Sequence, residues 1–314
     1  MSVNLQPRDR TNRFLAECAL DLTSTPLSWV MPFPTSLLSG IQIPSSATAR
    51  DVAILWMMLA VEAHCASSGE PHEARSIAIG RLSPDVLKRG GPRAAAEVCE
   101  RLADLRVLLR TARLLAFELA PALTEDRRSI VWKLSADIRE RFEDGYRLDR
   151  NRVAKFFRVE VGVACVASTR WAMSLYAVIG AATIKHRRMA SEEGWIALSL
   201  PISLLVRQLG WSGHQQKDFR PKVLRPALRS LCMSPTSPVL YPRYLRIEIM
   251  DDRDEIIQLR SQRLGRNGTA LDSLEVRKRL HAQRLGLADV LSTEVGMPAG
   301  RADEDGPLRQ GFVF

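Results

Sequence analysis

Five cationic side chains lie within one fifteen-residue stretch, residues 217–231, which reads KDFRPKVLRPALRSL. They are Lys217, Arg220, Lys222, Arg225 and Arg229. The apolar residues of this stretch recur every three or four positions, which predicts an amphipathic helix with the cations on or near its outer side. Arginine and lysine on such a helix can bind phosphate oxygens and, in the major groove, guanine edges. The stretch therefore predicts a helix that binds duplex DNA, and a solvated basic face is the alternative.

Two prolines, Pro221 and Pro226, interrupt the helical pattern. Pro221 suits the first turn of a helix, where its missing N–H leaves no hydrogen bond unmade. Pro226 removes one backbone hydrogen bond, so we expect a kink or a tightened start to the helix. The sequence leaves open whether the helix bends at Pro226 or begins there.

Four further cations are candidate DNA contacts. Arg187 and Arg188 belong to KHRR, which follows a helix predicted over residues 168–184, and they could bind phosphate or simply lie in a solvated loop. Arg243 and Arg246 lie on a strand predicted to lead into a hairpin. Trp171 and Tyr176 are expected in the core rather than stacked on bases, because the helix that carries them is apolar on all sides.

The positive charge is concentrated in one part of the chain. The 314 residues carry 45 Lys and Arg against 35 Asp and Glu, a net charge of +10. Residues 1–150 contain 20 Lys and Arg against 19 Asp and Glu. Residues 151–265 contain 18 Lys and Arg against 9 Asp and Glu, and residues 266–314 contain 7 of each kind. One block of the chain thus carries almost all of the excess, which indicates an anion-binding domain; nucleic acid and a membrane surface are the two anionic partners to consider.

The sequence lacks the motifs of the common catalytic and metal sites. There is no P-loop, no dinucleotide-binding glycine motif, no G-x-S-x-G and no H-E-x-x-H, and the five histidines never occur as H-x-H. The five cysteines include no C-x-x-C pair and are expected to be free thiols in a reducing cytoplasm. We therefore expect no catalytic residue, no metal and no cofactor: the protein is interpreted as a non-enzyme.

An acidic run, DDRDE at residues 251–255, is the exception that needs its own interpretation. A hairpin turn explains it most simply, with Asp251, Asp252 and Asp254 pointing apart and binding no metal. The alternative is a primase or nuclease that uses these acids, which metal-dependent activity on primed or single-stranded DNA would reveal.

No membrane association is expected. No stretch reaches the roughly 18 apolar residues of a membrane span, and the opening residues lack an apolar run of the secretory kind. The expected location is the cytoplasm, associated with the nucleoid or a plasmid.

The predicted fold class is α+β, mainly helical, with four segments. They are an irregular N-terminal segment (1–45), a first domain for dimerisation (46–150), a second domain for DNA binding (151–265) and a helix with a flexible tail (266–314). In the first domain we expect helices over 45–65 and 91–110, a short strand and helix within 77–91, and a strand pair over 113–123 and 129–138.

The second domain repeats the layout more clearly. The expected elements are helix 168–184, strand 195–201, helix 202–211, helix 217–231 and two strands, 239–250 and 255–262. In the C-terminal segment, residues 271–291 are expected to form a helix. Helix, helix, helix, hairpin is the layout of a winged helix, so we predict two winged-helix domains in tandem.

Two segments resemble a known family. TRWAMSLYAVI (169–179) and DFRPKVLRPALRSL (218–231) are similar in pattern to the plasmid replication initiator (Rep) proteins that contain two winged helices. Trp171 stands where that family usually has tyrosine, and the hairpin turn is acidic where a DNA-contacting wing would be basic. The resemblance covers residues 150–262 well and the first domain by layout alone.

The resemblance implies a function. A protein of this family binds double-stranded DNA at origin repeats, helps to open the duplex and recruits host replication proteins such as the initiator and the helicase. The first domain would then mediate a homodimer. The alternative is a winged-helix transcription repressor that regulates its own promoter; direct repeats beside an A·T-rich tract would favour the initiator, and one inverted repeat over a promoter would favour the repressor.

Overall fold

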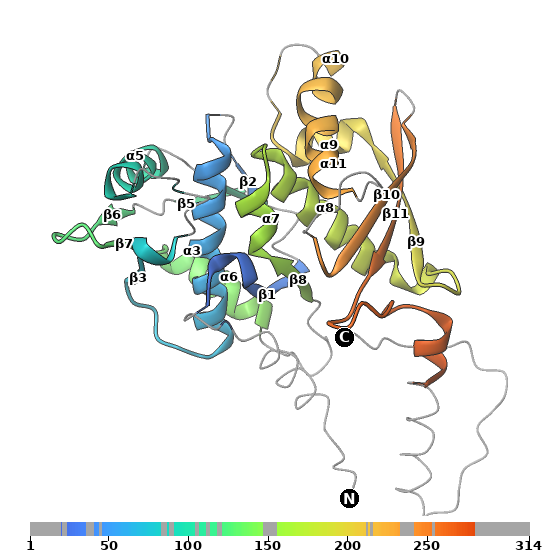
Figure 1. Ribbon diagram of the computed structural model, residues 1–314, viewed down its shortest axis with the longest axis horizontal. Coiled ribbons are helices and arrows are strands. Elements are labelled where there is room, and N and C mark those ends of the chain that lie inside the picture. Colours follow the sequence, from blue (N-terminus) through green and yellow to red (C-terminus); the bar gives the residue numbers. More distant parts are fainter. Residues whose placement is uncertain are drawn as a thin grey trace, which may run out of the picture.

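The computed structural model describes most of the chain between residues 20 and 279. The described residues are 20, 24–35, 41–43, 46–82, 87, 91–103, 107–110, 114–117, 121–146, 156–211, 213, 216–232, 242–252 and 255–279. Figure 1 shows two halves side by side, each made of helices and a small antiparallel sheet. This mixture of helix and sheet agrees with the predicted α+β class.

Helix α3 (Ala49–Ser67) is the centre of the first half. Thr48 begins it with a capping box: its side chain accepts from the Asp51 N–H, and the Asp51 carboxylate accepts from the Thr48 N–H. Arg101 of helix α5 (Gly91–Ala103) binds the same buried carboxylate at 2.9 Å.

The first half also contains strand β3 (Arg75–Ala78), the short turn η2 (Ile79–Arg81), strands β6 (Ala122–Leu123) and β7 (Ser129–Trp132), and helix α6 (Ala136–Tyr146). The three strands form an antiparallel sheet in the order β3-β7-β6. The short helix expected after β3, at Ser83, lies outside the described residues.

Two predicted elements of the first half are wrong. The helix expected over 91–110 ends at Ala103, and residues 107–110 form strand β4 (Val107–Arg110). Strand β4 pairs with β5 (Leu114–Phe117) and with β2 (Ile41–Gln42), so four residues of the apolar run at 113–123 belong to a second sheet, while Ala122 and Leu123 of the same run pair with β7. Pairing with β2, distant in the sequence, overrides the local helical pattern.

The strand expected over 129–138 is also too long. It ends at Trp132, and helix α6 begins at Ala136. Ile138, Phe142 and Tyr146 are all buried, and their spacing of four residues is the helical signal that the sequence interpretation missed.

A two-stranded sheet lies between the two halves (Figure 1). Strand β1 (Val30–Pro34), which follows the turn η1 (Pro26–Ser28), pairs antiparallel with β8 (Phe156–Glu160), and the short helix α7 (Val161–Val166) follows β8 directly. Part of the segment predicted to be irregular, residues 1–45, is thus a regular strand. The domain boundaries themselves stay predictions.

The second half begins with helix α8 (Trp171–His186), followed by the turn η4 (Arg187–Met189), strand β9 (Trp195–Pro201) and helix α9 (Ile202–Gln208). A helical run over residues 216–231 and the hairpin of β10 (Leu245–Asp252) and β11 (Ile256–Arg263) complete it. Trp171 and Tyr176 of α8 are 4% and 0% exposed, which confirms that they belong to the core. At Gly180, α8 approaches β8 so closely that a Cβ would lie 2.3 Å from the Phe157 ring.

The strand order of the second sheet is β10-β11-β9, so in both halves the second strand of the hairpin lies in the middle of the sheet. The winged-helix layout predicted for both halves, helix, helix, helix and hairpin, stays a prediction: in the first half most of the residues of the expected second helix are not described, and β4 and β5 lie between α5 and the β6–β7 hairpin. After β11, Asp272 binds Arg263 at 2.6 Å in a buried ion pair, and residues 274–279 are helical. Residues 280–314, where the rest of the predicted helix and the tail lie, are outside the described part of the chain.

Candidate nucleic-acid interface

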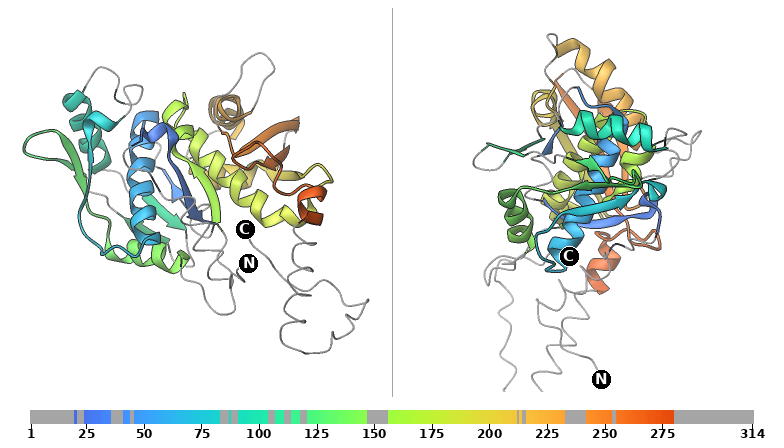
Figure 2. Two further views of the ribbon diagram at one scale, coloured as in Figure 1. Left: turned by 60° about the horizontal axis from the view of Figure 1, so that its bottom comes forward. Right: turned by 90° about the vertical axis from the view of Figure 1, so that its left-hand side faces the viewer.

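The cation-rich stretch forms one helical run over residues 216–231. It consists of α10 (Gln216–Phe219), a π-helical turn η5 (Arg220–Leu224) and α11 (Arg225–Leu231). Phe219, Leu224 and Arg225 all have right-handed helical dihedral angles, so the chain passes through both prolines without leaving the helix. The run protrudes from the top of the molecule in Figure 1 and in the right-hand view of Figure 2.

The π turn corrects the predictions made for the prolines. The Arg225 N–H donates to the Arg220 carbonyl, five residues back rather than four. A proline ring clashes with the carbonyl four residues before it in a regular helix, and the wider turn makes room ahead of Pro226. Pro221 lies within this turn and not in the first turn of the run. The helix therefore neither begins at Pro226 nor tightens there.

The π turn contains one residue more than a regular helical turn, and this also aligns the buried side chains of the run. Four of them, Phe219, Val223, Ala227 and Leu231, are spaced by four residues and are 0% exposed. In a regular helix this spacing drifts by about 40° per step, or about 120° from residue 219 to residue 231. One wide turn removes about 100° of that drift, which keeps all four on one face.

The same geometry aligns three cations on the opposite side. Lys217, Arg225 and Arg229 are exposed, and residues 217 and 229 are again separated by twelve positions across the π turn. Lys217 and Arg229 therefore differ by about 20° in their angular position around the helix axis. Phe219 lies about 200° from Lys217, on the opposite side of the helix. We call Lys217, Arg225 and Arg229 the cation stripe.

The other two cations of the run are placed differently. Arg220 is half-buried. Lys222 is exposed but binds the Asp218 carboxylate at 2.8 Å, an i,i+4 pair that offsets its charge locally. Of the five residues predicted to contact DNA on this helix, three thus lie on the cation stripe: Lys217, Arg225 and Arg229.

An aromatic cluster holds the helical run against α8. Trp211, in the turn after α9, lies 6.2 Å from Trp171 of α8 and 6.4 Å from Phe219 of α10, measured between ring centroids. These rings bury the apolar face of the run at the beginning of α8. The cation stripe is therefore presented on a firmly packed helix.

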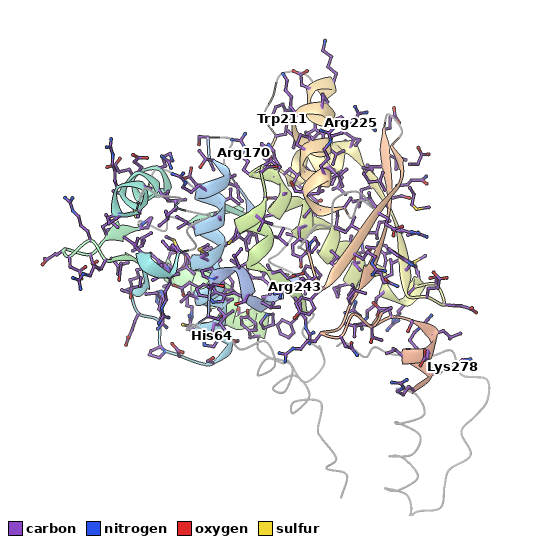
Figure 3. The ribbon with its side chains drawn as sticks, viewed as in Figure 1. His64, Arg170, Trp211, Arg225, Arg243 and Lys278 are labelled. Atoms are coloured by element: carbon purple, nitrogen blue, oxygen red, sulfur yellow. The ribbon has the colours of Figure 1, made fainter. Side chains whose placement is uncertain are left out.

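Arg243 and Arg246 do not join the cation stripe. Arg243 precedes β10, and its guanidinium binds the Glu160 carboxylate at 3.4 Å. Arg246 lies on β10 and contacts Gln262 at 3.4 Å and the Trp195 ring at 6.0 Å. Figure 3 shows Arg225 near the top of the second half and Arg243 well below it. The structure thus separates these two predicted contacts from the helix.

Glu160 is a positioning residue that the sequence interpretation missed. Its carboxylate is 0% exposed and accepts the backbone N–H groups of Arg243 and Tyr244, both at 2.8 Å. The Tyr176 hydroxyl donates to the Arg158 carbonyl and lies 3.4 Å from the same carboxylate. Burial raises the pKa of Glu160, and the bound N–H groups and Arg243 oppose that shift. A single carboxylate thus connects β8, α8 and the start of the hairpin.

Arg187 and Arg188 lie at the other end of α8. The sixteen residues of α8 separate them from Trp171 by about 24 Å. Arg187 is half-buried, and burial together with the positive charge of Arg263 lowers its pKa. Arg188 is exposed. These two residues therefore form a surface separate from the cation stripe.

The acidic run lies where β10 meets β11, but Asp251 and Asp252 belong to strand β10 and not to the turn, and residues 253–254 lie outside the described part of the chain. Among the described residues, no group of three His, Cys, Asp or Glu side chains could hold a metal ion. The expectation that the turn binds no metal stays a prediction, because Asp254 is not described.

The described cysteines are free thiols. Cys65 and Cys99 are buried, and Cys165 and Cys232 are half-buried, while Cys18 is outside the described residues. Burial raises the pKa of Cys65 to about 12 and that of Cys99 to about 11, so neither is a reactive thiolate near neutral pH. Within the described residues, no helix combines the length and the apolar character that crossing a bilayer requires.

Comparisons with known proteins add little. No protein-family model and no curated protein sequence matches this chain. A solved structure of RctB domains 2-3 is similar over 67% of this chain and 80% of that chain, with a TM-score of 0.34 and 14% sequence identity. A likeness at this TM-score carries no argument about the fold or the function.

Proposed function

We propose that this chain is a sequence-specific DNA-binding protein that initiates plasmid replication. The observation that carries the proposal is the cation stripe: Lys217, Arg225 and Arg229 aligned on the exposed side of a helix whose opposite side is buried. The resemblance of residues 169–179 and 218–231 to the Rep family supports the same conclusion. In this proposal the second half is a winged helix, with α8 and α9 before the recognition helix and β10–β11 as the wing.

The recognition helix would lie in the major groove. Arg225, near the middle of the run, would bind a guanine edge, a contact that discriminates between bases by about 1–3 kcal/mol. Lys217 and Arg229, toward the ends, would bind phosphates, each adding about 0.9 to the slope of log affinity against log salt. The π turn supports this role, because it keeps all three cations on one side.

The wing tip would contribute little to phosphate binding. Asp251 and Glu255 flank the described ends of the turn, and phosphates repel carboxylates. The affinity would therefore come mainly from the helix. Arg243 and Arg246 would serve contacts within the protein, to Glu160 and Gln262, rather than contacts to DNA.

The remaining parts of the proposal follow from the family resemblance. The chain would bind origin repeats, help to open the duplex and recruit host replication proteins. The first half, with almost no net charge in the sequence, would mediate a homodimer. The protein would act without catalytic residues, metal or cofactor, in the cytoplasm. An autoregulatory repressor would use the same helix, and the arrangement of sites in the neighbouring DNA separates the two functions.

Selection from a random-sequence duplex library tests the proposal. With the full chain as bait, one sequence motif should be enriched, and the selected duplex should bind at least about 10³-fold more tightly than an unselected one. Several direct copies of the motif near the gene would support an initiator, and a single inverted copy over a promoter would support a repressor. Equal affinity for every duplex would contradict both functions.

A further inference from the structure

Strand β9 is an edge strand without a charged side chain. Its seven residues, Trp195–Pro201, read WIALSLP, and the strand order β10-β11-β9 places β9 at one edge of its sheet. Among the described residues, no strand pairs with the outer side of β9. Exposed edge strands are templates for pairing with other strands, so proteins usually protect them with charges, bulges or prolines.

The other edge strand of the same sheet has this protection. Strand β10 carries four charged side chains, and a β-bulge interrupts its register between Ile249 and Asp251. Strand β9 has a proline only at its last position, and its register with β11 is continuous. One edge of the sheet is thus blocked and the other is able to pair, which indicates that the edge of β9 is an interaction surface.

The hydrogen bond at the end of β9 shows which backbone groups point outward. The Ile202 N–H donates to the carbonyl of Glu255, the residue before β11, at 2.9 Å. Bonded residues alternate along an antiparallel pair, so the even-numbered residues of β9 bond to β11. The N–H and C=O groups of Ala197 and Ser199 therefore point outward, and both residues are exposed.

Both ends of this edge are closed to pairing. The Trp195 N–H donates to the Ser191 hydroxyl at 3.1 Å, and the Trp195 carbonyl accepts from the Ser191 N–H at 2.8 Å. At the other end, Pro201 has no N–H to donate. The groups that can bond a partner strand in both directions are therefore those of Ala197 and Ser199.

We propose that β9 of one copy pairs antiparallel with β9 of a second copy, centred on Leu198. Ala197 of each copy then lies opposite Ser199 of the other, and each such pair exchanges both N–H···O bonds. The two three-stranded sheets become one continuous sheet. Ala197 and Ser199 are small and uncharged, so neither bulk nor like charge opposes the pairing.

The edge is complementary to itself, which is why a second copy is the partner. In this register the two closed ends also face each other, because Trp195 of one copy lies opposite Pro201 of the other. The contact is isologous and closes as a dimer. Figure 1 shows β9 at the right-hand side of the second half, away from the first half, so this contact is separate from the dimer proposed there and needs no DNA.

The contact is small, and contacts of this size are transient between free molecules. Disulfide trapping detects such a contact, because each encounter in the right register can be captured and the product accumulates. It also reports which residues lie opposite each other, which distinguishes this pairing from any other association of the chain.

The experiment uses two full-length proteins, one with Ala197→Cys and the other with Ser199→Cys, oxidised by diamide either mixed or separately. In the proposed register the Cα atoms of positions 197 and 199 of the two copies are about 5.5 Å apart, within the range that a disulfide spans. The two copies of position 197 are about 8 Å apart, beyond that range, and so are the two copies of position 199.

The mixture should form the disulfide between positions 197 and 199 at least about tenfold faster than either protein alone forms its own cross-link. Mass spectrometry of the linked peptides identifies the bond and separates it from cross-links of the native cysteines. The matched control mixes Val166→Cys with Met250→Cys, whose positions are 46% and 58% exposed and lie on other elements. It should cross-link only at the slow rate of random collision.

Adding Ala197→Pro to the Ser199→Cys protein blocks the edge. Proline at this position removes an outward N–H and leaves the hydrogen bonds to β11 in place, so trapping in the mixture should fall about tenfold. Circular dichroism checks that this variant stays folded.

Equal trapping in the mixture, in the separate proteins and in the control would overturn the inference, and so would trapping that a folded Ala197→Pro variant leaves unchanged. Faster cross-linking of either protein alone than of the mixture would contradict the proposed register. None of these measurements involves DNA, so they decide the β9 contact whether or not the proposed function holds.

Discussion

Replacing Lys217, Arg225 and Arg229 together by glutamine should lower the affinity for the selected duplex by about 100- to 1,000-fold near physiological salt. The substitution removes the cation stripe and leaves the buried face of the helix unchanged. Loss of two phosphate contacts should also reduce the slope of log affinity against log salt concentration by about 1.8. Fluorescence anisotropy titrations at several salt concentrations measure both effects.

The matched control makes the same change in charge elsewhere. Arg188→Gln, Lys278→Gln and Arg279→Gln also remove three exposed cations from the second half of the molecule. On a single-site duplex this control should bind within about threefold of the unsubstituted protein, because each surface cation that does not contact DNA contributes only through screened, distant charge. Equal losses in the two triple variants would mean that net charge, not the helix, determines binding.

Glu160→Gln should destabilise the fold by about 2–4 kcal/mol. Both oxygens of the buried carboxylate accept N–H donors, from Arg243 and Tyr244. Either orientation of a glutamine amide turns an NH₂ group toward one of these donors and leaves one of the two backbone N–H groups without its acceptor. Urea unfolding followed by circular dichroism measures the change in the free energy of unfolding.

Glu192→Gln is the control for this prediction, since Glu192 has an exposed side chain on a loop of the same half. It should alter the stability by no more than about 0.5 kcal/mol. If Glu160→Gln is equally mild, the carboxylate does not connect β8 to the start of the hairpin in the way its contacts indicate.

The second half of the fold could be predicted from the sequence to a large extent. Helix α8, strand β9, helix α9 and strand β11 lie close to where the apolar pattern predicted them, whereas the strand expected over 239–250 begins at Leu245 and ends at Asp252. The burial of Phe219, Val223, Leu224, Leu228 and Leu231 was also predicted. In this part of the chain, local pattern and tertiary packing agree.

The first half could not be predicted in the same way. Residues 107–110 continue the helical pattern of α5, but they form a hairpin with β5, and Leu108 and Leu109 also pair with β2, about 65 positions earlier in the sequence. The pairing with β2 leaves no local signal. The helical spacing of Ile138, Phe142 and Tyr146, by contrast, was present in the sequence and was obscured by the preceding strand.

At the candidate site, the sequence indicated the helix but not its geometry. Two prolines signalled an irregularity and left open whether the helix would bend or begin at Pro226, but a π-helical turn was not among the expected outcomes. Arg220 is half-buried and Arg243 binds Glu160, and no local sequence signal predicts either feature. Both depend on elements that are distant along the chain.

The most direct test of the central claim, that the helix over residues 216–231 reads DNA sequence, compares Arg225→Ala with Arg229→Ala. Each variant is titrated against the selected duplex, against duplexes with each base pair of the motif changed in turn, and against unselected DNA. Arg225→Ala should lose about 5- to 150-fold in affinity for the selected duplex, little for unselected DNA, and its preference at one base pair. Arg229→Ala should weaken binding to all duplexes alike and reduce the salt slope by about 0.9. If both variants keep the full base preference and the affinity of the unsubstituted protein, this helix is not the DNA reader.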